Sequence, residues 1–150
     1  MSKKKTFAYL SGQFVKTDQI LAPVSLFGYG AFTSIKYSPA GLLFLDKHLD
    51  RLKYNCRELH MPYPTDDVIL EAIKSALNKN KMLDKEVIVR VTLFPQKIIW
   101  SDPQKIKETP CDILVTTREM YKLPQDFRLK TVRLIRPLPH LKTTNYVVNM

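Results

Sequence analysis

Arg136-Pro-Leu-Pro-His-Leu-Lys-Thr-Thr-Asn-Tyr-Val-Val-Asn-Met150 is the stretch from which the rest of this sequence is best understood. Its one lysine, Lys142, follows a proline-stiffened approach and precedes a Thr-Thr-Asn step that suits a helix cap or an anion contact. A lysine held in such a segment can serve as an imine-forming amine. The same pattern also suits a surface lysine in a turn, because lysine is seldom buried without a partner.

This segment and two motifs that precede it carry a resemblance. Residues 139–146, Pro-His-Leu-Lys-Thr-Thr-Asn-Tyr, resemble the lysine motif of the class IV (fold-type IV) pyridoxal-phosphate enzymes, which include branched-chain and D-amino-acid aminotransferases and aminodeoxychorismate lyase. Residues 27–33 resemble the Gly-Asp-Gly start of a strand in that family, with Tyr29 in place of the aspartate. Residues 48–52, His-Leu-Asp-Arg-Leu, resemble its His-Leu-x-Arg-Leu helix. Together the motifs span most of the chain from about residue 27.

The resemblance implies three cofactor contacts, with pyridoxal 5'-phosphate as the cofactor. Lys142 matches the family's catalytic lysine, which holds the cofactor and then moves protons as a general base and acid. Arg51 matches the phosphate-binding arginine, and a permanently charged guanidinium suits two phosphate oxygens. Tyr146 stands, with a one-residue difference in spacing, where branched-chain members have a tyrosine near the phenolate oxygen. Without the motifs, Arg51 would be a solvent-facing residue of an amphipathic helix and Tyr146 a packed tyrosine at a helix start.

Two residues are candidates for substrate binding by the same resemblance. Phe32 stands where D-amino-acid members use a tyrosine against the substrate, but its lack of a hydroxyl also suits a core residue. Arg90 lies in the middle of the β-branched run 87–94 and can reach a substrate carboxylate or form a structural salt bridge. Thr33 after Phe32 resembles the lyase branch more than the aminotransferases.

Hydrophobic periodicity predicts two helices. Asp46 is a plausible N-cap for a helix running to about Leu59, and Thr65 or Asp66 for a second one. The first helix has an apolar stripe spaced by three and four residues, and the second a longer one. These predicted buried positions are Leu49, Leu52, Cys56 and Leu59, then Val68, Ile69, Ala72, Ile73, Ala76 and Leu77.

Alternation and β-branched runs predict strands over residues 6–10, 31–37, 42–45, 86–94, 97–100 and 112–117, and a hairpin arm around residues 14–21. We expect the segments 97–100 and 112–117 to pair with each other. We therefore expect an α+β fold, in which an antiparallel sheet carries two helices packed on one face. We expect an N-terminal domain over residues 1–120, an interdomain linker over 121–128, and the start of a truncated second domain over 129–150. Because a helix starting at residue 144 cannot bury its apolar face alone, the chain reads as half of a longer protein.

Composition narrows the functional classes. The 150 residues carry a net charge of +10, but the basic residues are dispersed, so nucleic-acid binding is a minor alternative. No apolar run reaches the ~20 residues that cross a membrane, and Cys56 and Cys111 form no metal motif. A reduced cytoplasmic protein, without metal, nucleic acid or membrane as a partner, fits best.

The sequence therefore predicts a pyridoxal-phosphate-dependent class IV enzyme, and first an aminotransferase acting on a small amino acid and a 2-oxo acid, as a homodimer. An aminodeoxychorismate-lyase-like enzyme is the variant within that class. A non-catalytic truncated domain that serves as a dimerisation or interaction module is the alternative outside it. In the family, the acid against the ring nitrogen lies beyond the region that this chain resembles, so we expect the 150 residues alone to bind cofactor weakly or not at all and to be inactive.

Overall fold

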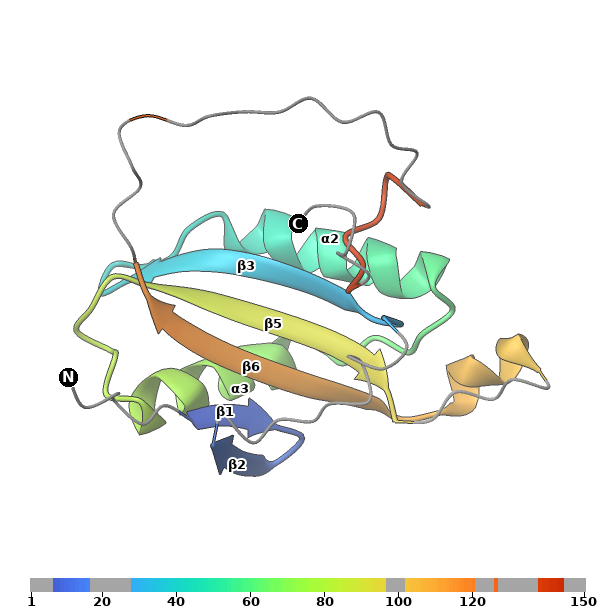
Figure 1. Cartoon of the computed structure of the whole chain (residues 1–150), viewed down its shortest axis with the longest axis horizontal. Coiled ribbons are helices and arrows are strands. Elements are labelled where there is room, and N and C mark those ends of the chain that lie inside the picture. Colours follow the sequence, from blue (N-terminus) through green and yellow to red (C-terminus); the bar gives the residue numbers. More distant parts are fainter. Residues whose placement is uncertain (1–6, 17–27, 97–101, 121–125, 127–137, 145–150) are drawn as a thin grey trace.

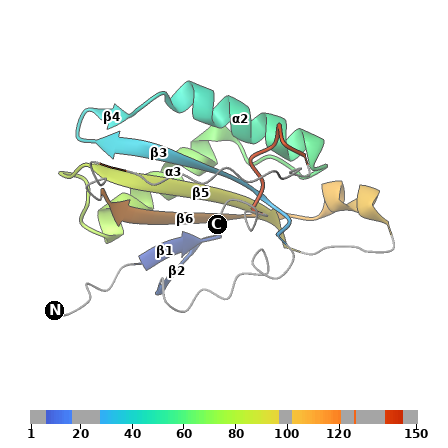
Figure 2. The same cartoon turned by 45° about the horizontal axis from the view of Figure 1, so that its top comes forward.

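The structure, a computed structural model, describes residues 7–16, 28–96, 102–120, 126 and 138–144. These residues form one antiparallel sheet with two helices on one of its faces (Figures 1 and 2). The elements are β1 (Phe7–Leu10), β2 (Gln13–Lys16), β3 (Ala31–Ser38), β4 (Gly41–Leu42), α2 (Leu45–Glu58), α3 (Asp66–Lys79), β5 (Val87–Pro95), the 3-10 helix η2 (Pro103–Glu108) and β6 (Cys111–Glu119). The predicted α+β class is confirmed.

The six strands of the described residues follow the order β2-β1-β6-β5-β3-β4. The long central strands β3, β5 and β6 pair over most of their lengths, with Ser34 opposite Arg90 and Arg90 opposite Thr116. In β5 the residues that face the helices and the residues that face away alternate, as strand geometry requires. The register therefore places Phe32, Ser34, Arg90 and Thr92 on the face that lies away from the helices.

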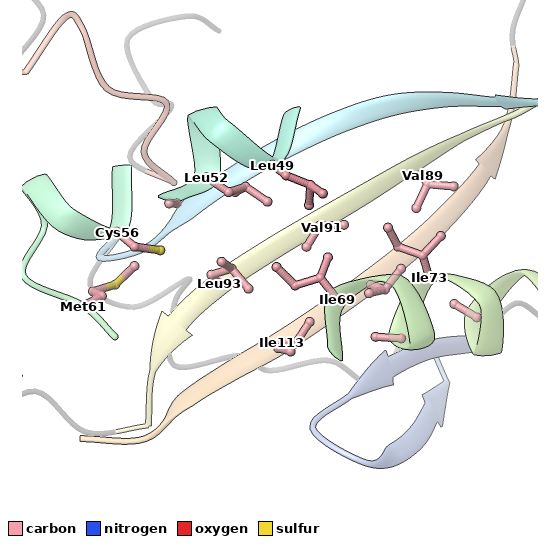
Figure 3. Close-up of a cluster of buried hydrophobic side chains, with 14 of the residues drawn as sticks. Leu49, Leu52, Cys56, Met61, Ile69, Ile73, Val89, Val91, Leu93 and Ile113 are labelled. Carbon is pink, nitrogen blue, oxygen red and sulfur yellow. The ribbon is translucent and has the colours of Figure 1, made fainter. Parts of the chain in front are cut away.

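The hydrophobic core lies between the sheet and the two helices (Figure 3). Every second residue of β5 contributes to it, and Val87, Val89, Val91 and Leu93 are all fully buried. The helices contribute the apolar stripes that their periodicity predicts. The side chains of β5 alternate with a period of two residues and those of the helices repeat every 3.6 residues, which accounts for a sheet layer packed on a helix layer. The labelled side chains of Figure 3 are Leu49, Leu52, Cys56, Met61, Ile69, Ile73, Val89, Val91, Leu93 and Ile113.

The start of α2 differs from the prediction. Asp46 is not the N-cap, because the helix begins at Leu45 and Phe44 occupies the N-cap position with a φ of 52° and no side-chain cap. Asp46 lies in the first turn instead, where its charge still suits the helix dipole. The predicted strand over residues 42–45 is wrong for the same reason. The chain has only Gly41–Leu42 in β4 before it turns at Leu43 and Phe44 into the helix.

The second helix begins as predicted, because the Thr65 side chain accepts a hydrogen bond from the Val68 backbone N–H. The expectation that Val68 is buried is wrong, since 51% of this residue is exposed. Val68 lies at the flank of the stripe formed by Ile69, Ile73 and Ala76, and the first turn of α3 turns it toward solvent.

Both helices end in the same way, with a left-handed residue after the cap. His60 and Lys81 have φ angles of 51° and 54°. The following methionine N–H groups reach back to the carbonyls of Cys56 and Leu77, at 2.8 and 2.9 Å. These are Schellman motifs, and the methionines, Met61 and Met82, are buried in the core.

The predicted strand over residues 97–100 lies outside the described residues. Its expected partner, the segment 112–117, belongs to β6 and pairs instead with β5 and β1. The proposed linker 121–128 and most of the segment 129–150 also lie outside the described residues, apart from residue 126 and residues 138–144. The predicted domain boundaries therefore stay predictions.

Candidate active site

The lysine segment, residues 138–144, docks against the start of β3 (Figures 1 and 2). Thr143 forms an antiparallel β-bridge with Ala31. The backbone N–H of Phe32 donates to the Lys142 carbonyl at 3.0 Å, and the N–H of Thr144 donates to the Gly30 carbonyl at 2.9 Å. These paired bonds fix the backbone on both sides of Thr143.

Side-chain alternation decides where Lys142 points. Thr143 pairs with Ala31, which faces the helices, and both residues are buried. Lys142 must therefore project to the other face, beside Phe32. Its ammonium nitrogen lies 5.0 Å from the centroid of the Phe32 ring, within cation–π range. The half-buried lysine is consequently held by the sheet and is not the tip of a free turn.

Arg51 projects from α2 toward β3 and meets two partners. Its Nη2 atom lies 2.7 Å from Thr33 Oγ1 and 3.0 Å from His48 Nδ1. Thr33 Oγ1 and His48 Nδ1 are themselves 2.6 Å apart, so the three side chains close a triangle. His48 and Arg51 share one helix face because they are three residues apart. Thr33 lies between Ala31 and Ile35 on the helix-facing side of β3 and is fully buried.

The imidazole of His48 contacts Arg51 and lies within electrostatic range of Lys142. Burial lowers the pKa of His48, and the positive charges of Arg51 and then Lys142 lower it further, whereas Asp46 opposes them. Arg51 therefore contacts His48, and the charge of Lys142, from a segment far apart in the sequence, acts on the same imidazole. An anion bound beside Arg51 meets a permanently charged guanidinium and a histidine whose lowered pKa favours its neutral form.

The two predicted substrate residues also lie together. The Cζ atom of Arg90 is 3.9 Å from the centroid of the Phe32 ring, and Phe32 is only 4% exposed. The Phe32 ring therefore has two cations near it, Arg90 and Lys142. Arg90 itself is exposed on the face away from the helices, which explains how a charge fits in the middle of a β-branched run.

Tyr146 lies outside the described residues, so its predicted contact with the cofactor stays a prediction. Two residues were missed as members of the site, His48 and Thr33. The signals that could have found them are the i,i+3 spacing of His48 and Arg51 and the alternation of β3, which turns Thr33 toward the helix.

Tyr29, which replaces the family's aspartate, has a structural contact of its own. Its hydroxyl donates a hydrogen bond to the carbonyl of Leu59, the residue that ends α2. Burial raises the pKa of this phenol, so it keeps the proton that it donates. Tyr29 thus ties the strand start to the end of the helix that carries Arg51.

One buried polar group of the lysine segment is available to a polar ligand. Among the described residues, the Thr144 hydroxyl is buried without a hydrogen-bond partner. Buried polar groups are normally paired, and a ligand is one source of partners. With the cations of Arg51 and Lys142 nearby, the donor set fits an anionic, phosphate-bearing ligand that also offers a carbonyl to an amine.

Other kinds of site have no support among the described residues. They contain no group of three or more His, Cys, Asp or Glu side chains that could hold a metal ion. None of their helices has both the length and the apolar character needed to span a membrane.

Comparison with solved structures shows what the fold resembles. The branched-chain aminotransferase of the archaeon Thermoproteus uzoniensis, with norvaline, matches at a TM-score of 0.62 and 18% identity, over 79% of this chain and 42% of that one. The branched-chain aminotransferase from T.th., with pyridoxamine 5'-phosphate, matches at 0.62 and 20% identity, over 80% and 42%. The Escherichia coli enzyme matches at 0.59 and 18% identity, over 78% and 42%. The chain thus spans about two fifths of the length of these structures.

Sequence comparison identifies the family directly. A search of the curated proteins finds no match. The amino-transferase class IV family, by contrast, matches residues 30–150, which include β3, α2 and the lysine segment. The chain therefore belongs to the amino-transferase class IV family.

Proposed function

We propose that this protein is a pyridoxal-phosphate-dependent aminotransferase that moves an amino group between a small amino acid and a 2-oxo acid. The observation that carries the proposal is the docking of the lysine segment on the first residues of β3, the strand whose Thr33 accepts a hydrogen bond from Arg51. Class IV aminotransferases depend on pyridoxal phosphate, so family membership names the cofactor. Bound pyridoxal phosphate would supply an aldehyde and an electron-withdrawing ring.

Each residue of the chain has a distinct task in this proposal. Arg51 binds the cofactor phosphate, because a guanidinium keeps its charge at any working pH and has donors to spare. Lys142 supplies the amine that bonds the aldehyde, and afterwards carries the proton to and from the substrate carbon. The hydrogen bonds of its backbone to β3 fix the point from which the amine reaches.

Arg90 and Phe32 would handle the substrate. The Arg90 guanidinium is exposed on the same sheet face as the Lys142 side chain and can bind a carboxylate there. Phe32 contacts both cations and would exclude water from the side of the reacting atoms. Tyr146 remains the proposed donor to the cofactor's phenolate oxygen. The protein that works this way is proposed to be a cytoplasmic homodimer with a second domain that begins near residue 129.

The neighbours support the proposed substrate class. The Thermoproteus uzoniensis structure is one with norvaline, and one of the T.th. structures is a complex with N-(5'-phosphopyridoxyl)-L-glutamate. Both are small 2-amino acids or their adducts, which supports an aminotransferase more than a lyase. Assays of 2-oxo-acid formation and of pyruvate release with aminodeoxychorismate separate the two activities.

The proposal is tested by reductive trapping. Incubation of the protein at its full length, with the proposed second domain, with pyridoxal phosphate and borohydride, followed by peptide mapping, should place the label on Lys142. The 150 residues alone should be labelled weakly or not at all. Lys142→Arg should abolish that label, whereas Lys36→Arg should retain it. Lys36 is the matched control, because it lies on the same face of β3 as Phe32 and its ammonium forms a salt bridge with Glu86 at 3.0 Å. Labelling spread evenly over surface lysines, and unchanged in Lys142→Arg, contradicts the proposal.

A further inference from the structure

We infer that Thr33 and His48 are positioning residues for Arg51, and that together they set the preference of the site for a phosphorylated over an unphosphorylated aldehyde. The inference deepens the proposed function and rests on it. It starts from the triangle of 2.6, 2.7 and 3.0 Å that joins the three side chains.

The hydrogens of the triangle are assigned from the donor and acceptor capacity of each side chain. Arg51 can only donate, so Thr33 Oγ1 accepts from Nη2 and has its own hydrogen left to donate. His48 Nδ1 is the acceptor for that hydrogen and also faces the Arg51 donor, so Nδ1 carries no proton. The neutral ring then bears its hydrogen on Nε2. The lowered pKa of His48 agrees with this neutral form.

The assignment also decides which edge of Arg51 meets a ligand. Thr33 Oγ1 and His48 Nδ1 are only 2.6 Å apart, so they lie on one side of Nη2 and share one of its two hydrogens. The other Nη2 hydrogen and the hydrogens on Nη1 and Nε can donate to an anion. The guanidinium is thereby turned to a fixed orientation, with one nitrogen anchored to the protein and the others presented outward.

The contacts of Arg51 with Thr33 and His48 matter because Arg51 is an exposed residue at the surface of α2. A free arginine side chain has many rotamers, and ordering it on binding costs free energy. Thr33 is fully buried in a paired strand, and its β-branched side chain has few χ1 choices. The hydrogen bonds to Thr33 and His48 therefore order the Arg51 side chain before the ligand binds, and such preorganisation raises affinity.

This role predicts a selective effect on the phosphate. Removing the Thr33 hydroxyl should weaken binding of pyridoxal phosphate but leave binding of pyridoxal, which has no phosphate, almost unchanged. Loss of a single positioning hydrogen bond of ordinary strength corresponds to roughly a five- to tenfold fall in affinity. A residue that only supports the fold would weaken both aldehydes alike.

The experiment measures the concentration of each aldehyde that half-saturates borohydride trapping at Lys142, in the protein at its full length with the proposed second domain. Thr33→Val removes the hydroxyl at nearly constant volume, and Thr33→Ser keeps it. His48→Leu removes the Nδ1 acceptor, whereas His48→Asn keeps an acceptor near that position. We expect the ratio of the two half-saturating concentrations to move toward one in Thr33→Val and His48→Leu, and to stay close to wild type in Thr33→Ser and His48→Asn. In an Arg51→Gln background, Thr33→Val should have no further effect on the ratio.

The outcomes separate this inference from the proposed function. If the wild-type chain traps both aldehydes equally, or none at Lys142, the proposed function fails and the inference with it. If the wild type prefers pyridoxal phosphate but Thr33→Val weakens both aldehydes alike, or keeps its effect without Arg51, only the inference is overturned. Circular dichroism and urea unfolding of each variant show whether it is folded, and a misfolded Thr33→Val leaves the His48→Leu and His48→Asn pair to decide.

Discussion

The backbone N–H of Phe32 donates a hydrogen bond to the carbonyl of Lys142 at 3.0 Å, and the ammonium of the same lysine lies 5.0 Å from the centroid of the Phe32 ring. One residue of β3 therefore holds both the backbone and the side chain of the candidate catalytic lysine. Arg90 contacts the same ring at 3.9 Å. The phenyl ring is the common surface on which two cations from distant parts of the sequence are arranged.

The first prediction concerns this ring. Phe32→Leu keeps an apolar side chain but removes the aromatic face, which costs each cation about 0.5–1 kcal/mol of attraction. We expect Lys142 trapping to require about two- to fivefold more aldehyde in this variant, as the corresponding change in free energy implies. Phe32→Tyr retains the ring and is the matched control. Equal behaviour of the two variants would show that the ring face has no part in positioning the lysine.

The second prediction concerns the pH dependence of stability. Folding lowers the pKa of His48 from 6.5, so the unfolded chain takes up its proton first as the pH falls. The free energy of unfolding should be unaffected by this group above about pH 6.5, should decrease as the pH drops below 6.5, and should become level again below the folded pKa. Asp46 opposes the effect, whereas Arg51 and Lys142 enhance it.

Urea unfolding between pH 7.5 and pH 5 checks this dependence. The variant His48→Asn should lose stability less steeply than the wild type as the pH falls. The control is His60→Asn, because His60 is exposed and asparagine tolerates its left-handed backbone, with a φ of 51°. A slope that disappears with His60→Asn but persists with His48→Asn would contradict the assignment.

The third prediction concerns the start of α2. Phe44 is 68% exposed and has a φ of 52°, a conformation that costs a residue with a side chain about 1–2 kcal/mol and asparagine less. Phe44→Asn should therefore raise the free energy of unfolding by about 1 kcal/mol. Leu43→Asn is the control, since Leu43 is 51% exposed and lacks the positive φ. If the free energy of unfolding rises by a similar amount in both variants, the cause is the loss of surface hydrophobicity and not the relief of backbone strain at Phe44.

The fourth prediction concerns Asn80, which joins α3 to the outer part of the sheet. Its side chain accepts from the Phe7 N–H at 2.8 Å and donates to the Phe7 carbonyl at 2.7 Å and to Thr117 Oγ1 at 2.9 Å. Asn80→Ala should lower stability by roughly 1–3 kcal/mol, because it leaves these partly buried partners unpaired. It should also speed amide exchange in β1.

Asn78→Ala provides the comparison for Asn80, as Asn78 is an exposed residue near the end of the same helix. Its removal should change stability by less than about 0.5 kcal/mol. If the two alanine variants unfold at the same urea concentration, the Asn80 bonds contribute nothing measurable.

The sequence could predict the layers of this fold because each layer has its own period. The stripe of Leu49, Leu52 and Cys56 is a local pattern and is buried as predicted, and the β-branched run 87–94 forms a central strand, β5, as predicted. Boundaries were less predictable. The start of α2 depends on a left-handed Phe44, which no propensity favours, and the exposure of Val68 depends on how α3 is rotated against the sheet.

The candidate site likewise has residues that local motifs could predict and contacts that they could not. Lys142 and Arg51 could be named from motifs, because each motif is a continuous run of residues. The triangle with Thr33 could not, since it requires the register of α2 over β3, and this register is fixed by packing between residues far apart in sequence. The contact of Phe32 with two cations likewise depends on strand pairing that a single sequence does not specify.

The bridge between Thr143 and Ala31 has a consequence beyond chemistry. Among the described residues, β4 pairs only with Tyr37 and Ser38, so the first half of β3 has an outer edge that the lysine segment occupies. An uncovered strand edge is a template on which other chains can add. A shortened protein that ends before Pro139 would therefore be expected to aggregate through β3, and solubility would depend on the same residues as the amine chemistry.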